Sequence, residues 1–154
     1  MHDVQTRTET ASVYVNTEIA RLLLRDDTSR ELASTRSAIA EAAYYLSDPI
    51  EPGERERLLV TAEAVRRDCS GEEREERAAD ALGLLTDAAD EVEQLLRGPG
   101  DNSEIRIARK AVFRAIADLA RHIGIATTRV SGASAASLGP ARIGALRRVR
   151  RARQ

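Results

Sequence analysis

Apolar residues recur every three or four positions from residue 10 to residue 123, which is the pattern of amphipathic helices. The pattern predicts five helical segments, at residues 10–25, 28–48, 52–69, 70–97 and 101–123. The fourth segment has the clearest seam, with apolar residues at alternating spacings of four and three: Ala78, Leu82, Leu85, Ala89, Val92 and Leu96. Five helices with short connections predict an all-α fold, an antiparallel helical bundle of four to five helices.

Local signals predict where these helices begin and end. Three capping boxes indicate helix starts, at Thr28–Glu31, Ser70–Glu73 and Asp101–Glu104. Pro52 is placed for the first turn of a helix, and Gly124 for a left-handed cap after one. We expect the four helices from residue 28 onward to form the core. The segment 10–25 either joins that core or serves as an arm that binds a partner.

Composition narrows the class of protein. Only 3% of the residues are aromatic, and Ala, Leu, Arg and Glu are abundant, which excludes an all-β domain. The chain lacks a run of 18 apolar residues, and its first residues lack the basic and apolar regions of a secretory signal. Its one cysteine, Cys69, excludes an internal disulfide. We therefore expect a cytoplasmic protein that does not insert into a membrane.

The formal net charge of −1 conceals a strong asymmetry along the chain. Residues 1–97 hold 22 Asp and Glu against 12 Lys and Arg, whereas residues 98–154 hold 3 against 12. Accordingly, we divide the chain into an acidic helical bundle region (1–97), a basic amphipathic helix that packs on the bundle (101–124), and a flexible Ser/Ala/Gly linker with an Arg-rich tail (125–154). Such asymmetry favours nucleic acid as a partner of the basic part.

The basic residues of segment 101–123 are predicted to share one side of its helix. At 100° per residue, Arg106, Lys110, Arg114 and Arg121 point roughly opposite the apolar stripe. Such a row can follow a phosphate backbone. Further candidate nucleic-acid-binding residues follow in the tail: Arg129, Arg142, Arg147, Arg148, Arg150 and Arg151.

Small, turn and apolar residues of segment 119–131 form a short pattern: Ala120, Gly124 and Val130, with Ile123 and Ile125 flanking the glycine. In this spacing the segment resembles the helix-turn-helix of lactose-repressor-type regulators. The resemblance implies a recognition helix that presents Thr127, Thr128 and Arg129 to base edges. A second interpretation stays open, because the first helix of that motif is short and the pattern here runs continuously from residue 101. In that interpretation Gly124 caps a long helix and a flexible tail follows.

Catalytic and metal-binding patterns are missing from the predicted helices. A di-metal bundle needs Glu-x-x-His on its apolar stripes, and the chain contains none. Asp118 and His122 lie one helical turn apart and can form a pair, but no nucleophile lies at a matching spacing. Cys69 falls on an apolar stripe and is interpreted as a small core residue. We expect no enzymatic activity, no metal, no cofactor and no small-molecule substrate.

The sequence supports two hypotheses of function. In the first, a non-enzymatic protein uses its acidic bundle for self-association or contact with a protein partner, and its basic helix and tail bind nucleic acid, with a regulatory role. In the second, it is a helical adaptor for protein–protein interaction that does not bind nucleic acid. Both place the partner interface on the seam of the fourth segment, at Leu82, Leu85, Val92 and Leu96.

Overall fold

The structure, a computed structural model, describes residues 4–98 and 102–124, and their side chains from Thr10 onward. Five helices make up most of this part of the chain: α1 (Val4–Arg25), α2 (Ala33–Ser47), α3 (Pro52–Asp68), α4 (Arg74–Leu96) and α5 (Ser103–Ile123). A short 3-10 turn, η1 (Arg30–Leu32), precedes α2. No strand occurs among these residues, so the predicted all-α fold is confirmed.

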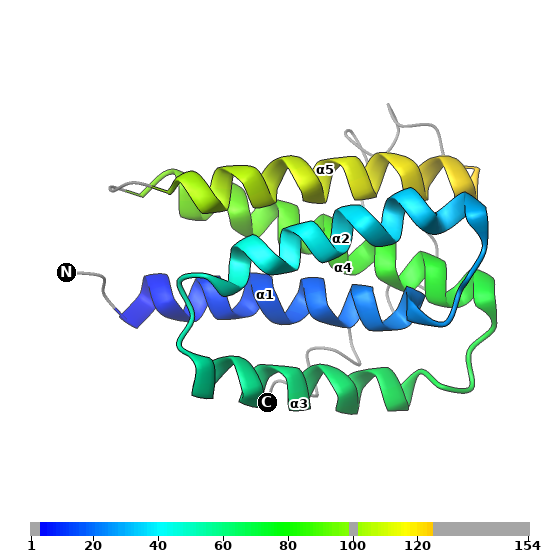
Figure 1. Cartoon of the computed structure of the whole chain (residues 1–154), viewed down its shortest axis with the longest axis horizontal. Coiled ribbons are helices and arrows are strands. Elements are labelled where there is room, and N and C mark those ends of the chain that lie inside the picture. Colours follow the sequence, from blue (N-terminus) through cyan, green and yellow to red (C-terminus); the bar gives the residue numbers. More distant parts are fainter. Residues whose placement is uncertain (1–3, 99–101, 125–154) are drawn as a thin grey trace.

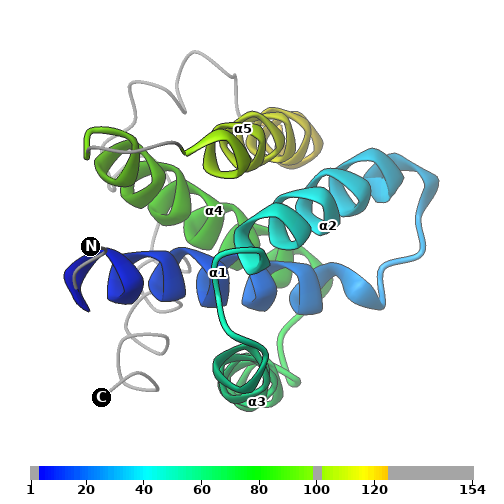
Figure 2. The same ribbon diagram turned by 60° about the vertical axis from the view of Figure 1, so that its left-hand side comes forward.

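Successive helices run in opposite directions along the chain, which confirms the antiparallel bundle (Figure 1). α1 packs against α2, α3 and α4, whereas α5 packs against α2 and α4. Viewed from another side, α5 lies above α2 and α4, α1 lies beneath these two, and α3 lies below α1 (Figure 2). The outermost helices are therefore α5 on one side and α3 on the opposite side.

α1 joins the core and lies at its centre. Every residue from 13 to 20 is buried, so this helix has no solvent-facing side along two turns. The polar residues within this stretch have partners: Asn16 Nδ2 donates a hydrogen bond to Glu91 Oε1 at 3.0 Å, and Arg21 donates two to Glu18, at 3.0 and 2.7 Å. A hydrogen bond removes most of the cost of burying such groups.

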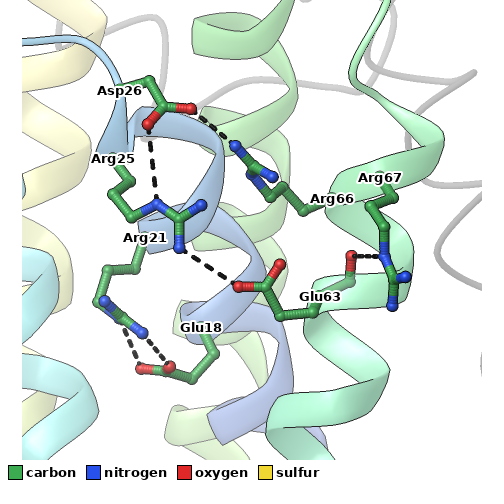
Figure 3. A network of polar contacts seen from close by, with 7 residues as sticks. All are labelled: Glu18, Arg21, Arg25, Asp26, Glu63, Arg66 and Arg67. Carbon is green, nitrogen blue, oxygen red and sulfur yellow. Dashed lines mark hydrogen bonds and ion pairs between the residues drawn. The ribbon is translucent and has the colours of Figure 1, made fainter.

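α3 is a peripheral helix, although it was expected among the four helices that form the core. Only Ala62 and Val65 of this helix are buried, and its main packing is against α1. Two ion pairs reinforce this contact, Arg66–Asp26 at 2.7 Å and Arg25–Glu63 at 3.3 Å (Figure 3). Because these pairs are solvent-accessible, each stabilises the contact by about 1 kcal/mol at most.

Two of the predicted helix boundaries are confirmed. Pro52 occupies the first turn of α3, and Gly124 caps α5 with a φ of 86°, in the left-handed region that favours glycine. α1 begins at Val4, six residues before the expected start.

Two of the three predicted capping boxes are wrong, because α2 and α4 begin after Leu32 and Glu73 and neither N-cap side chain makes a capping hydrogen bond. The third box starts at Asp101, which lies outside the described residues, and α5 begins after Asn102. Ahead of α2, the Asp27 carboxylate accepts a hydrogen bond from the Ser29 N–H at 3.0 Å, in place of the expected contact between Thr28 and Glu31. Within the described ranges, no helix combines the length and apolar character needed to cross a lipid bilayer.

Candidate nucleic-acid interface

The candidate interface is the outward side of α5. The opposite side of this helix packs against α2 and α4. Its buried residues include Ile105, Ala108, Val112, Ala115, Ile116 and Leu119. The four basic residues predicted to share a side are all exposed: Arg106, Lys110, Arg114 and Arg121. We call these four residues the basic face. It extends about 22 Å along the helix axis, at 1.5 Å per residue.

Two residues of the basic face have carboxylate partners. Arg114 pairs with Glu41 of α2, and Arg121 pairs with Asp118 one turn earlier in α5. The side chains of Arg114 and Arg121 remain 60% and 69% exposed. Because exposed pairs of this kind contribute only about 0–1 kcal/mol, a phosphate can displace the carboxylate at low cost.

The other two residues of the basic face are not neutralised by any carboxylate in the described part of the chain. Arg106 and Lys110 lie one turn apart near the start of α5, and both are exposed. The sequence of α5 contains five Lys and Arg residues but only two acidic residues, Glu104 and Asp118. The first half of the basic face is therefore its most positive part.

Phe113 adds an aromatic ring beside the basic face, and the sequence analysis did not select it. The ring is 43% exposed, and the Arg109 guanidinium lies 5.0 Å from its centroid, within the range of a cation–π contact. Arg109 also pairs with Glu93 of α4. Phe113 follows Lys110 by three residues, so its ring lies on the same side of the helix. The spacing of Phe113 from Arg109 and Lys110 is visible in the sequence and could have indicated this residue.

The predicted pair of Asp118 and His122 is not formed. Asp118 instead accepts a hydrogen bond from Ser34 Oγ at 2.9 Å and pairs with Arg121. His122 Nδ1 lies 3.5 Å from a carboxylate oxygen of Glu31. These contacts attach the end of α5 to η1 and to the start of α2, and leave no acid–base pair at the predicted position.

The remaining candidate residues of the nucleic-acid hypothesis lie outside the described residues: Arg129, Arg142, Arg147, Arg148, Arg150 and Arg151. Only the first part of the segment that resembles a helix-turn-helix is described, up to Gly124. There α5 runs without interruption over 21 residues, longer than the first helix of that motif. The left-handed Gly124 fits both interpretations of the sequence equally well.

The predicted partner interface on α4 needs a correction. Leu82, Leu85 and Val92 are 1% or less exposed and belong to the chain's own core, where they pack against neighbouring helices. Leu96 is partly buried against the same core. The seam was recognised correctly as apolar, but a single folded chain already covers most of it, so Leu82, Leu85 and Val92 are not available to a partner.

A second group of polar residues lies where α3 ends and α4 begins. The Cys69 thiol, a Glu72 carboxylate oxygen and an Asp80 carboxylate oxygen all lie within 4.8 Å of one another. Cys69 and Asp80 are 3% and 1% exposed, and Glu72 is half-buried. Cys69 is a core residue, as its apolar stripe predicts, but its spacing to the two acids in the sequence does not reveal the cluster.

Comparison of the chain with protein-family models, curated proteins and solved structures finds no match.

Proposed function

We propose that the chain binds nucleic acid through the basic face of α5 together with the arginines of residues 125–154, and reads little base sequence. The observation that carries this proposal is the exposure of Arg106 and Lys110 without a described carboxylate partner. Each cation that meets a phosphate releases counterions, and this release drives binding to any sequence.

Phe113 supports the same proposal. An exposed ring beside lysine and arginine can stack on an unpaired base, which is a contact that tolerates any base. The proposal predicts that binding depends strongly on salt and weakly on sequence.

The decisive experiment measures the affinity of the full chain for a fluorescent duplex by anisotropy, over a series of salt concentrations. The double variant Arg106→Ala, Lys110→Ala should lower the slope of log K against log salt by about two units, or about one for each lost phosphate contact. Arg114→Ala should have a smaller effect, because Arg114 must first leave Glu41.

The matched control is Arg57→Ala, Arg67→Ala, which removes two exposed arginines from α3, on the opposite side of the bundle (Figure 1). It changes the net charge equally and should leave the slope unchanged. Absence of binding below about 50 mM salt would overturn the proposal. Equal effects of the two double variants would overturn the assignment to α5.

The ion pairs of Arg109 with Glu93 and of Arg114 with Glu41 favour a second candidate function, that of a helical adaptor. They show that the arginines of α5 can pair with acids presented by another helix, as they would with an acidic partner protein. This function predicts a complex that dissociates at high salt, together with no affinity for the duplex.

A further inference from the structure

The buried cluster of Cys69, Glu72 and Asp80 has a composition suited to a metal ion. Its three members come from different segments: Cys69 ends α3, Glu72 lies in the connection, and Asp80 lies in the second turn of α4. Thiolate sulfur and carboxylate oxygen are both zinc ligands, and sites with three protein ligands leave a fourth position for water.

The local chain holds the first two donors in place. The Cys69 N–H donates to the Arg66 carbonyl at 3.0 Å and the Ser70 N–H to the Arg67 carbonyl at 3.1 Å, which closes the last turn of α3. The Glu72 N–H donates to the Cys69 carbonyl at 3.1 Å, which folds the connection back towards the thiol. Arg77 donates to the Glu72 carbonyl at 3.1 Å and fixes the connection against α4.

The electrostatics of the cluster favour a cation. Three groups that become negative on deprotonation lie within 4.8 Å of one another, and two of them are almost completely buried. Burying like charges this closely is costly, and a divalent cation offsets that cost for all three groups together. Metal binding also releases the thiol proton to solvent.

We propose that Cys69, Glu72 and Asp80 bind a divalent transition-metal ion of the zinc type, with water as the fourth ligand. Donor atoms around tetrahedral zinc lie about 3.4 Å apart, so the side chains move inward by about 1 Å at most on binding. The ion joins the end of α3 to α4 and stabilises the attachment of the peripheral helix. This site is independent of the nucleic-acid interface.

The test uses the full chain after removal of metals with a chelator. Co²⁺ serves as the probe, because a cobalt–thiolate bond gives an intense charge-transfer band that carboxylates alone do not give. The expected result is such a band at one equivalent of Co²⁺. A 100-fold excess of Zn²⁺ over its dissociation constant should raise the Tm by about 5–10 °C.

Variants at the cluster and beside it decide the assignment. Cys69→Ser should abolish the charge-transfer band, and Glu72→Gln should weaken Co²⁺ binding at least about tenfold, as loss of a metal contact does. Glu73→Gln removes an exposed carboxylate next to the cluster and should change neither value. Absence of the band in the unmodified chain overturns the proposal, as does an unchanged affinity in both Glu72→Gln and Asp80→Asn.

Discussion

At the scale of a single residue, Asp27 organises the connection between α1 and α2. Its carboxylate accepts a hydrogen bond from Arg74 Nε at 2.6 Å and another from the Ser29 N–H at 3.0 Å. Burial of the carboxyl would raise its pKa, but the hydrogen bonds from Arg74 and Ser29 outweigh this effect and lower the pKa from 3.8 to about 2. The connection therefore depends on the charged form of Asp27.

The pH dependence of stability follows from this lowered pKa. A carboxyl whose pKa is lower in the folded chain stabilises it above the unfolded pKa of about 3.9, and the contribution is lost as the pH falls towards 2. Asp27→Asn should lower the free energy of unfolding by about 1 kcal/mol near neutral pH, allowing for solvent screening. Urea unfolding at several pH values measures the difference from the unmodified chain, which should shrink below about pH 4.

The neighbouring residue provides the control for this experiment. Asp26 also pairs with an arginine, Arg66, but its side chain is 67% exposed. Asp26→Asn should cost about 0.5 kcal/mol or less. A cost of Asp27→Asn that stays constant from neutral pH down to about pH 2 would contradict the assigned role.

At the scale of the helices, α4 shows what periodicity can predict. Its apolar spacing predicted a helix ending at residue 97, and the structure ends it at Leu96. The pattern is clear from residue 86 to residue 96, where one side of α4 packs against the core and the other side is partly exposed, which is the condition under which a period of 3.6 is visible; residues 80–85 are buried on all sides.

In α1 the periodicity of apolar residues no longer indicates which side of the helix is buried. The stretch 13–20 is buried on all sides, so polar and apolar residues no longer separate by position. Asn16 is buried because it donates a hydrogen bond to Glu91 of α4, 75 residues away, and such a partner is not visible in the local sequence. The capping boxes at Thr28 and Ser70 fail because α2 and α4 begin several residues later, after Leu32 and Glu73.

The peripheral position of α3 leads to a prediction about local opening. In native-state hydrogen exchange, amides of α3 should exchange through an opening of lower free energy than amides of residues 13–20, because α3 buries only Ala62 and Val65. Raising the salt from about 0.1 to 0.5 M should increase the exchange rates in α3 further, since it screens the pairs of Fig. 3. Residues 13–20 serve as the internal control. Equal protection of both helices would show that α3 belongs to the same cooperative unit.

At the scale of the whole molecule, the candidate interface combines predictable and unpredictable parts. Exposure of Arg106 and Lys110 follows from helical geometry, which is local, and so the sequence predicted it correctly. The partners of Arg109 and Arg114 come from α4 and α2, up to 73 residues away, and only the packing of three helices brings them together. The cluster of Cys69, Glu72 and Asp80 was missed for the same reason, because α3 and α4 must be placed before Asp80 meets Cys69.

The packing of α4 leads to a test of whether its apolar seam stabilises the folded chain or binds a second protein. Leu85 is fully buried among other helices, so Leu85→Ala should lower the free energy of unfolding by about 2–5 kcal/mol. Leu96 is only partly buried, and Leu96→Ala should cost less than half as much. Urea unfolding measures both costs, and light scattering measures the molar mass of each folded variant. If Leu85→Ala changed the molar mass and left the urea midpoint unchanged, Leu85 would contact a second protein, and its placement in the core of one chain would be wrong.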